Sequence, residues 1–201
     1  MHTLFELPPE FQNLPYDGSI EYMDDFLTST ECSTFFDELL TSTLWKNDTL
    51  FIYGKHITTK RKSAWYGKNP FSYTFSGQTL TAHPWNSPLE KIHQKISERT
   101  NLSFNSCLLN LYQDGSQGMG WHADNEPELD PTSPIISISI GAERYFDFKH
   151  KTSKFKMRFT LGSGSLLIMH PPTQKFWVHQ VPISKKIISP RINLTFRNCQ
   201  N

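Results

Sequence analysis

The chain has few cysteines, no long apolar run and no acidic residues over two long stretches. Cys32, Cys107 and Cys199 are scattered and form no C-x-x-C pair, which argues against a disulfide framework or a thiolate zinc site and favours reduced thiols. No apolar run reaches the length of a membrane span. The first residues lack the basic and then apolar pattern of an export signal, so we expect an intracellular protein without a membrane partner.

Acidic residues are missing from residues 49–89, which carry five Lys and Arg, and from the 54 residues after Asp147, which carry ten. The formal net charge is nevertheless only +1. Basic tracts that are interleaved with aromatic residues suit a polyanion such as nucleic acid. A solvated basic face is the ordinary alternative, and composition leaves it open.

The residues that are present predict one mostly β domain. A chain of 201 residues with 37% hydrophobic residues can bury a sizeable core. From residue 104 onward, segments with strand composition alternate with clusters of Gly, Pro, Asp and Ser. The expected strands are 107–112, 135–140, 144–148, 155–161, 165–169, 177–181 and 191–196. We therefore expect a two-sheet jelly roll, or double-stranded β-helix, over residues 104–198.

Two helices are expected before these strands. Thr28-Ser-Thr-Glu31 is a capping box that predicts a helix to about Ser42. Ser87-Pro-Leu-Glu90 repeats the start signal and predicts a second helix through Arg99. We expect both helices outside one sheet. Their apolar stripes are Phe35, Phe36, Leu39 and Leu40 in the first, and Leu89, Ile92 and Ile96 in the second.

Less regular structure is expected elsewhere in the first half of the chain. Residues 1–20 contain several prolines and suggest an irregular arm. Residues 49–75 suggest short extended pieces that are broken at Gly54, Gly67 and Pro70.

The stretch His122-Ala123-Asp124 carries a possible metal site. In a strand, side chains at i and i+2 point to one side, so His122 and Asp124 could bind one ion. His179 is the candidate third ligand, because two His and one carboxylate leave a face of octahedral iron open for a cosubstrate and dioxygen. His170 has no comparable set of neighbouring motifs and is rejected as a metal ligand. A structural hydrogen bond, or an ordinary core histidine at 179, remains the alternative.

Residues 191–197 predict a strand with one apolar and one wholly polar face. The apolar residues are Ile192, Leu194 and Phe196, and the polar ones are Arg191, Asn193, Thr195 and Arg197. A polar face this rich suggests a lined cavity. An Arg fork binds a carboxylate through two hydrogen bonds, which would hold the far end of a 2-oxo diacid while its keto-acid end chelates iron. Arg191 is placed for this contact.

These segments resemble the AlkB family of iron- and 2-oxoglutarate-dependent nucleic-acid demethylases, within it the eukaryotic DNA-repair branch. The likeness covers roughly residues 20–198 and rests on His122-x-Asp124 with His179, on Asn110-Leu-Tyr112, and on residues 191–197. The other matching segments, in the same order, are 64–67, 73–76, 134–141 and 164–169.

The resemblance implies a complete reaction. Fe(II) would be held by His122, Asp124 and His179, with 2-oxoglutarate as cosubstrate and O2 as oxidant. The implied activity is oxidative demethylation of 1-methyladenine and 3-methylcytosine in DNA, with RNA open, which yields succinate and formaldehyde and repairs alkylation damage. We expect a monomer that acts on alkylated DNA. The implied cosubstrate contacts are Asn110, Tyr112, Arg191, Asn193 and Arg197. For Arg197, a contact with a nearby carboxylate instead of the cosubstrate stays open.

The resemblance also implies a nucleotide-recognition lid over residues 49–76. The implied substrate contacts are Trp65, Tyr66, Tyr73, Phe75, Ser76 and Glu126, and the implied wedge or backbone contacts are Tyr53, Lys55 and Arg61. Aromatic faces and a carboxylate both favour a cationic methylated base over its neutral parent. Core packing of Tyr112, a loop cap by Glu126 and an ordinary turn aromatic at Tyr53 remain open.

One feature departs from the duplex-repair members of this family. Their basic loop is longer than residues 149–154, so a firm grip on a complementary strand stays open, as does the choice between single- and double-stranded DNA. Two other functions also stay open. An oxygenase of the same kind could act on a protein, a lipid or a small metabolite, although the basic aromatic tract argues against it. A jelly-roll module could bind nucleic acid or metal without turnover, although the full ligand set argues against it.

Overall fold

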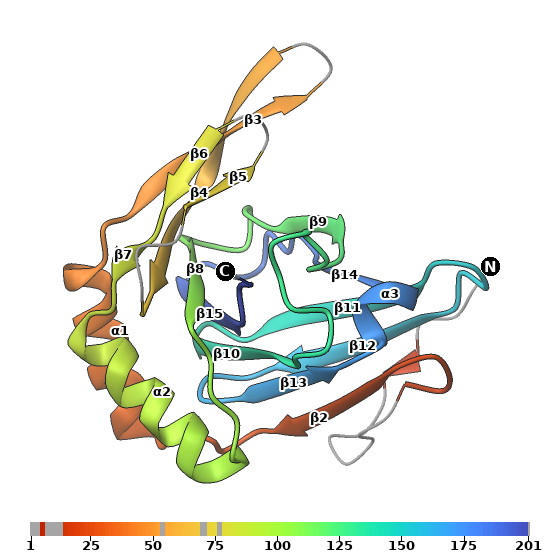
Figure 1. The fold of residues 1–201 in the computed structure, drawn as a ribbon, viewed down its shortest axis with the longest axis horizontal. Coiled ribbons are helices and arrows are strands. Elements are labelled where there is room, and N and C mark those ends of the chain that lie inside the picture. Colours follow the sequence, from red (N-terminus) through yellow and green to blue (C-terminus); the bar gives the residue numbers. More distant parts are fainter. Residues whose placement is uncertain (1–4, 7–13, 53–54, 69–71, 76–77, 201) are drawn as a thin grey trace.

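The computed structural model of the chain describes residues 5–6, 14–52, 55–68, 72–75 and 78–200, and the side chains of residues 14–47, 58–68 and 81–200. Two mainly antiparallel sheets face each other, and two helices cover the outside of the larger one (Figure 1). The predicted mostly β jelly roll with external helices is therefore confirmed. None of the described helices has the length and apolar composition that a membrane crossing requires.

The larger sheet has the strand order β2-β13-β10-β15-β8-β4-β3, with β7 paired to β4, and the smaller has the order β1-β12-β11-β14-β9. The bounds in the larger sheet are β2 (Ser19–Met23), β3 (Lys46–Ile52), β4 (Lys55–Gly67), β7 (His83–Pro84), β8 (Ser106–Tyr112), β10 (Ile135–Gly141), β13 (Leu166–His170) and β15 (Arg191–Arg197). Those in the smaller are β1 (Phe5–Glu6), β9 (Met119–His122), β11 (Arg144–His150), β12 (Lys156–Leu161) and β14 (Trp177–Val181). A separate ribbon pairs β5 (Ser72–Phe75) with β6 (Gln78–Thr81).

The helices are α1 (Ser29–Ser42), α2 (Ser87–Thr100) and the short α3 (Thr173–Phe176). The predicted capping box opens α1, since the Thr28 side chain accepts from the Glu31 amide and the Glu31 carboxylate accepts from the Thr28 amide. At α2 the cap is Asn86, one residue before the predicted signal, and its side chain accepts from the Leu89 amide. Local hydrogen bonding thus sets both starts.

Alternation along the strands divides the apolar residues between two layers. One cluster lies between the helices and the outer face of the larger sheet, and the other lies between the two sheets. Of the predicted helix stripes, Leu40 alone is exposed, at 41%, so its placement in the core was wrong. It follows Leu39 directly, and a step of about 100° around the helix turns it toward solvent.

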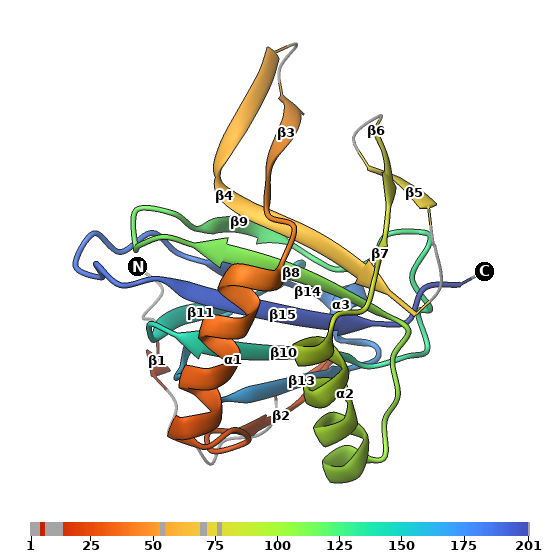
Figure 2. The ribbon, with the colours of Figure 1, turned by 90° about the vertical axis from the view of Figure 1, so that its left-hand side faces the viewer.

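Two regions outside the predicted jelly-roll strands also contain strands. β2 pairs with β13 at the edge of the larger sheet, so residues 19–20 are not part of a loose arm. β4 runs unbroken for 13 residues because it pairs with β3 on one side and with β8 on the other. It ends at Gly67, as predicted, whereas Gly54 and Pro70 lie outside the described residues. The far ends of β3 and β4, and the ribbon of β5 and β6, project away from the body of the molecule (Figure 2).

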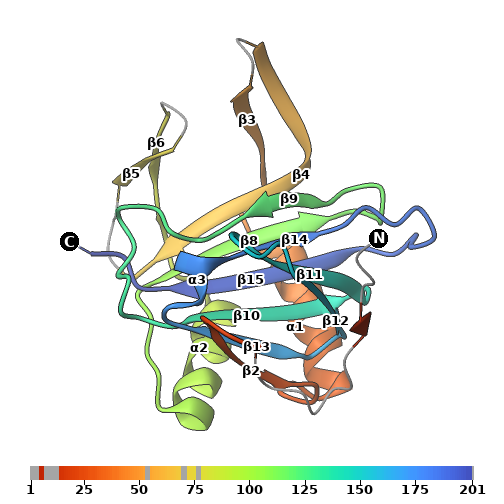
Figure 3. The same cartoon turned by 90° about the vertical axis from the view of Figure 1, so that its right-hand side faces the viewer.

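β15 has the two faces that its sequence predicts. Its apolar residues pack under the helices with those of β8 and β10, and its polar residues therefore face the smaller sheet. All seven residues of β15 are buried. Figure 3 shows β15 crossing the body of the molecule, with α1 behind the strands. The polar face of β15 consequently lines the space between the sheets.

Candidate metal and cosubstrate site

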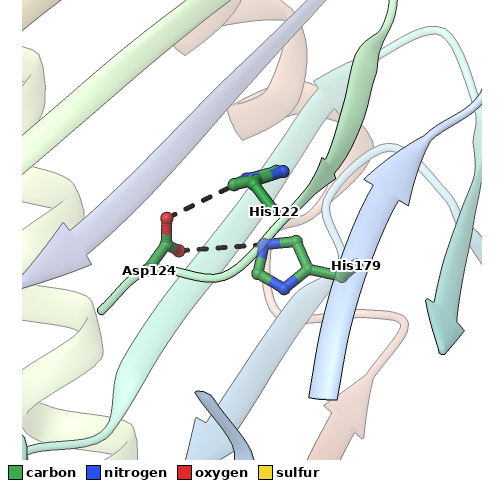
Figure 4. Close-up of side chains that lie close together, drawn as sticks. All are labelled: His122, Asp124 and His179. Atoms are coloured by element: carbon green, nitrogen blue, oxygen red, sulfur yellow. Dashed lines mark ion pairs between the residues drawn. The ribbon is translucent and has the colours of Figure 1, made fainter. Parts of the chain in front are cut away.

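Three ligand-type side chains meet between the sheets, where β9 ends (Figure 4). The ligand atoms of His122, Asp124 and His179 all lie within 4.8 Å of one another. His122 and His179 are opposite each other on the paired strands β9 and β14, which explains how residues 57 apart come together. Asp124 lies beyond the end of β9, so the same-strand argument is wrong for it. Its carboxylate reaches both imidazoles from the following bend, at 3.9 Å from each Nε2.

Neighbouring groups orient the three side chains. His122 Nδ1 lies 2.8 Å from the carbonyl oxygen of Gly120. A proton assigned to Nδ1 would donate to that carbonyl and leave the Nε2 lone pair available for a metal. The His179 ring stacks on Phe146, with centroids 5.1 Å apart. Gln174 Oε1 accepts from the Asp124 backbone amide at 3.0 Å, which holds the bend in place.

The electrostatic environment suits a divalent cation. Burial lowers the pKa of His179 to about 3, so its imidazole is neutral at physiological pH, as a metal ligand must be. Burial acts to raise the pKa of Asp124, but electrostatic interactions with its neighbours, the Arg197 guanidinium among them, outweigh it and hold that pKa below its ordinary value. Of these, Arg197 is charged at every physiological pH. Imidazole and carboxylate donors together fit Fe(II).

The predicted cosubstrate residues form one patch on the inner face of the larger sheet. Arg191 lies opposite Tyr112, and Asn193 lies opposite Asn110, on the paired strands β15 and β8. Arg191 is 1% exposed, and burial lowers its pKa to about 10, so it stays charged. Its Nη2 donates to Ser139 Oγ at 2.9 Å. Its Nε and Nη1 have no hydrogen-bond partner among the described residues, so the guanidinium keeps donors for an anionic ligand such as a carboxylate.

Two serines of β10 complete this patch and were missed in the sequence. Asn193 Nδ2 donates to Ser137 Oγ at 2.8 Å and to the carbonyl of Ile138 at 3.0 Å. Ser139 accepts from Arg191 as described above. The alternation of Ile and Ser in 136–140 could have shown two hydroxyls facing the polar side of β15.

Arg197 lies between two carboxylates. Its Nη1 is 3.8 Å from Asp124 Oδ1 and 3.6 Å from Glu126 Oε1. Arg197 therefore links the candidate metal ligand to the candidate substrate contact, a position that the sequence left open. Glu126 Oε2 is buried and has no hydrogen-bond partner among the described residues.

A cleft of about 380 Å³ opens beside the cluster. Asp124, Glu126 and Arg197 line it, together with residues of α3 and of the loop that follows Asp124. Trp65 lies at a smaller adjoining pocket that shares Glu126 and Arg197, and its Nε1 donates to Ser106 Oγ at 2.7 Å. A flat, positively charged group would find both room and an acidic partner here.

The other predicted substrate contacts are placed differently. Tyr66 follows Trp65 in β4 and so points to the opposite face, where it packs under the helices and accepts from the Leu44 amide. Its predicted contact with substrate is therefore wrong. Arg61 is 8% exposed, with Nη1 3.0 Å from Met119 Sδ, so a contact with phosphate would require it to move.

Some predicted contacts cannot be placed by their side chains. The backbones of Lys55, in β4, and of Tyr73 and Phe75, in β5, lie in strands, but their side chains lie outside the described part. Tyr53 and Ser76 lie outside the described residues altogether.

The predictions for His170 and for the basic turn after β11 agree with the structure. The rejected candidate His170 is outside the metal cluster and pairs with Glu21 Oε1 at 2.7 Å. The chain also turns directly from β11 into β12 through residues 151–155, where Lys154 adopts φ 63°. The basic segment at this turn is short, as its sequence indicated.

Comparison with known proteins agrees with this geometry. The model of the 2OG-Fe(II) oxygenase superfamily matches residues 19–197. The chain is 46% identical over 154 residues to DNA oxidative demethylase ALKBH2 of Mus musculus, covering 73% of this chain and 64% of that protein. It is 36% identical over 182 residues to alpha-ketoglutarate-dependent dioxygenase alkB homolog 3 of Bos taurus, covering 86% and 63%.

The chain spans about six tenths of the length of these curated relatives. Among solved structures, that of OsALKBH1 is similar, with a TM-score of 0.61 at 17% identity, and the match covers 89% of this chain and 97% of the other. At this identity the likeness supports the fold alone.

Proposed function

Because the chain belongs to the AlkB family within the 2OG-Fe(II) oxygenase superfamily, we propose that it oxidatively demethylates N-alkylated bases in DNA. The proposed substrates are 1-methyladenine and 3-methylcytosine, and the products are the repaired base, formaldehyde and succinate. The observation that carries the proposal is the His122–Asp124–His179 cluster between the sheets, together with the buried guanidinium of Arg191, which keeps donors without a partner among the described residues. The named relatives include DNA oxidative demethylases.

The protein's own residues bind and orient the reactants. His122, Asp124 and His179 would hold Fe(II), and Arg191 would bind the distal carboxylate of 2-oxoglutarate. Bound iron, with 2-oxoglutarate and O2, supplies an oxidant for the methyl C–H bond. Tyr112 and the two facing Asn side chains would complete the cosubstrate pocket, and Arg197 would steady the site between Asp124 and Glu126. Preset ligands of this kind reduce the reorganisation that binding requires.

A carboxylate in the cleft, that of Glu126, suits the methylated bases, which carry a positive charge. Glu126 offers a buried oxygen, Oε2, that has no hydrogen-bond partner among the described residues, and Trp65 lies at the adjoining pocket. We retain Tyr73 and Phe75 of β5 as stacking partners, with Lys55 and Tyr53 in the neighbouring hairpin as backbone and wedge contacts. The base must leave its stack to reach the iron, which a projecting hairpin would assist.

The proposed substrate also indicates where the protein works and in what form. Alkylated DNA places it inside the cell, in a nucleus or a nucleoid. We keep the expectation that it acts as a monomer. RNA carries the same damaged bases and is included in the test below.

Demethylation is tested directly with defined oligonucleotides. The protein is incubated with Fe(II), ascorbate and 2-oxoglutarate, and is offered either damaged base in single-stranded DNA, duplex DNA or RNA. We expect mass spectrometry to show loss of one CH2 unit as formaldehyde and succinate appear, with no change in unmethylated strands or without 2-oxoglutarate. Consumption of 2-oxoglutarate while every strand stays methylated would instead favour a protein or small-molecule substrate.

Glu126→Gln is expected to reduce kcat/KM for both damaged bases about 10-fold or more, because a hydrogen bond with a charged partner is worth about 1.5–3 kcal/mol. The KM for 2-oxoglutarate should stay unchanged. Glu128→Gln, the same change two residues along the loop, is the matched control. Steady-state kinetics on a single-stranded substrate measures both parameters. Equal losses in the two variants would show that Glu126 only stabilises the loop.

A further inference from the structure

We propose that Arg144 is a positioning residue that ties together the two loops joining the metal-ligand strands to the cosubstrate strands. The inference rests on the proposed function, since it takes 2-oxoglutarate as the ligand of the Arg191 pocket. It concerns a residue that neither the sequence patterns nor the cluster itself identifies.

Arg144 begins β11 and is 1% exposed. Its Nη2 donates to the carbonyls of Gln117, at 2.8 Å, and Pro182, at 2.9 Å, and its Nη1 lies 3.5 Å from the carbonyl of Asp114. These acceptors are backbone atoms of two different loops, residues 113–118 and 182–190. A planar guanidinium can hold several carbonyls at fixed angles, which the single ammonium of Lys cannot.

The two loops are equivalent in what they connect. Residues 113–118 lead from Tyr112, at the end of β8, to β9 with His122. Residues 182–190 lead from β14, with His179, to Arg191 at the start of β15. Each loop crosses from one sheet to the other, and each joins a metal ligand to a cosubstrate residue.

The loops are also bonded to each other. The Gly115 amide donates to the carbonyl of Ile187, and the Ser184 amide donates to the carbonyl of Gly115, both at 2.8 Å. Arg144 is therefore at the one junction that both crossovers share. A shift there would change the separation of the cosubstrate pocket from the metal cluster, and geometry of this kind must hold to about 0.5 Å.

Arg144 also contacts the cosubstrate pocket. The Cζ atoms of Arg144 and Arg191 each lie 5.5 Å from the ring centroid of Tyr112. A cation over an aromatic face restrains the ring. Arg144 thus positions Tyr112 directly as well as through the loops, and adds positive charge where an anionic cosubstrate would bind.

The experiment compares Arg144→Gln and Arg144→Lys with Arg158→Gln. Arg158, in the neighbouring strand β12, makes a two-bond ion pair with Asp147 at 2.6 and 3.0 Å. Its loss should lower stability without loosening the loops. In metal-free protein, we expect the amides of Gly115 and Ser184 to exchange hydrogen about tenfold faster in both Arg144 variants and not in the control.

Cosubstrate affinity is the second readout. Calorimetric titration of 2-oxoglutarate into Mn(II)-loaded protein should give a Kd raised about 10- to 100-fold in both Arg144 variants, the usual effect of removing a supporting residue. The control should bind as the wild type does. Arg144→Lys keeps the positive charge but loses the planar guanidinium. If Arg144→Gln does not fold, both the hydrogen-exchange and the titration experiments are made on Arg144→Lys.

A wild-type Kd for 2-oxoglutarate in Arg144→Lys would overturn the proposal that Arg144 ties the loops, because the charge alone would then be sufficient. Unchanged exchange at both loops would overturn it as well. A wild-type protein that does not bind 2-oxoglutarate would overturn the proposed function, while the exchange measurement would still decide whether Arg144 ties the loops.

Discussion

Replacing His122, His179 or Asp124 with alanine is expected to abolish demethylation while the fold survives. Each residue supplies one of three ligand atoms, and among the described residues this is the one group of His, Cys, Asp and Glu side chains that could hold a metal. A three-ligand site has no spare donor, so losing one leaves the iron weakly held. Turnover of a methylated oligonucleotide and the Kd for Fe(II) measure the two effects, and thermal unfolding reports on the fold.

His170→Ala is the matched control for these variants. His170 is a histidine with a carboxylate partner, Glu21, but it lies outside the cluster. The control should keep wild-type iron affinity and turnover. If any of the three alanine variants also kept both, that residue would not be a ligand.

Replacing Arg191 is expected to raise the KM for 2-oxoglutarate about 10- to 150-fold with little effect on iron binding. The loss corresponds to a charge-assisted contact of about 1.5–3 kcal/mol. Arg191→Met is the preferred variant because it keeps much of the side-chain volume and removes the charge. Steady-state kinetics against 2-oxoglutarate and a titration with Fe(II) measure the two quantities.

The stability of the ligand-free protein separates a binding role of Arg191 from a structural one. Arg191 is buried, and its Nε and Nη1 have no hydrogen-bond partner among the described residues. Replacing a buried charge of this kind by an apolar side chain is often neutral or stabilising. We therefore expect Arg191→Met to unfold at the wild-type temperature or above without ligands.

Arg158→Met is the control for this measurement. Arg158 has its own carboxylate partner in Asp147, so its replacement should lower stability and leave the KM for 2-oxoglutarate unchanged. A normal cosubstrate dependence in Arg191→Met would show that another cation, such as Arg144 or Arg197, holds the acid.

The sequence alone determined the features that depend on neighbours along the chain. The capping box at Thr28 and the Asn86 cap start helices through hydrogen bonds within three residues. The alternation in β15 predicted which side chains face the space between the sheets, because successive residues of a strand point to opposite sides. The candidate metal ligands and cosubstrate residues were predicted from those patterns and from the family resemblance.

The tertiary structure decided which of these faces meet. The pairing of β9 with β14 sets His122 opposite His179, and Asp124 approaches them from a bend rather than from a strand. The pairing of β10 with β15 brings Ser137 and Ser139 into the cosubstrate pocket.

Tyr66 and Arg144 both show that sequence patterns alone do not predict which residues a side chain contacts. Tyr66 belongs to an aromatic tract that suits substrate, yet strand pairing turns it toward the helices. Arg144 lies in no motif, yet it contacts carbonyls 27 to 38 residues away along the chain. The spacing of residues along the chain indicates which face of a strand each side chain occupies. The order of strands in a sheet decides which residues that side chain then contacts, and this order depends on packing throughout the domain.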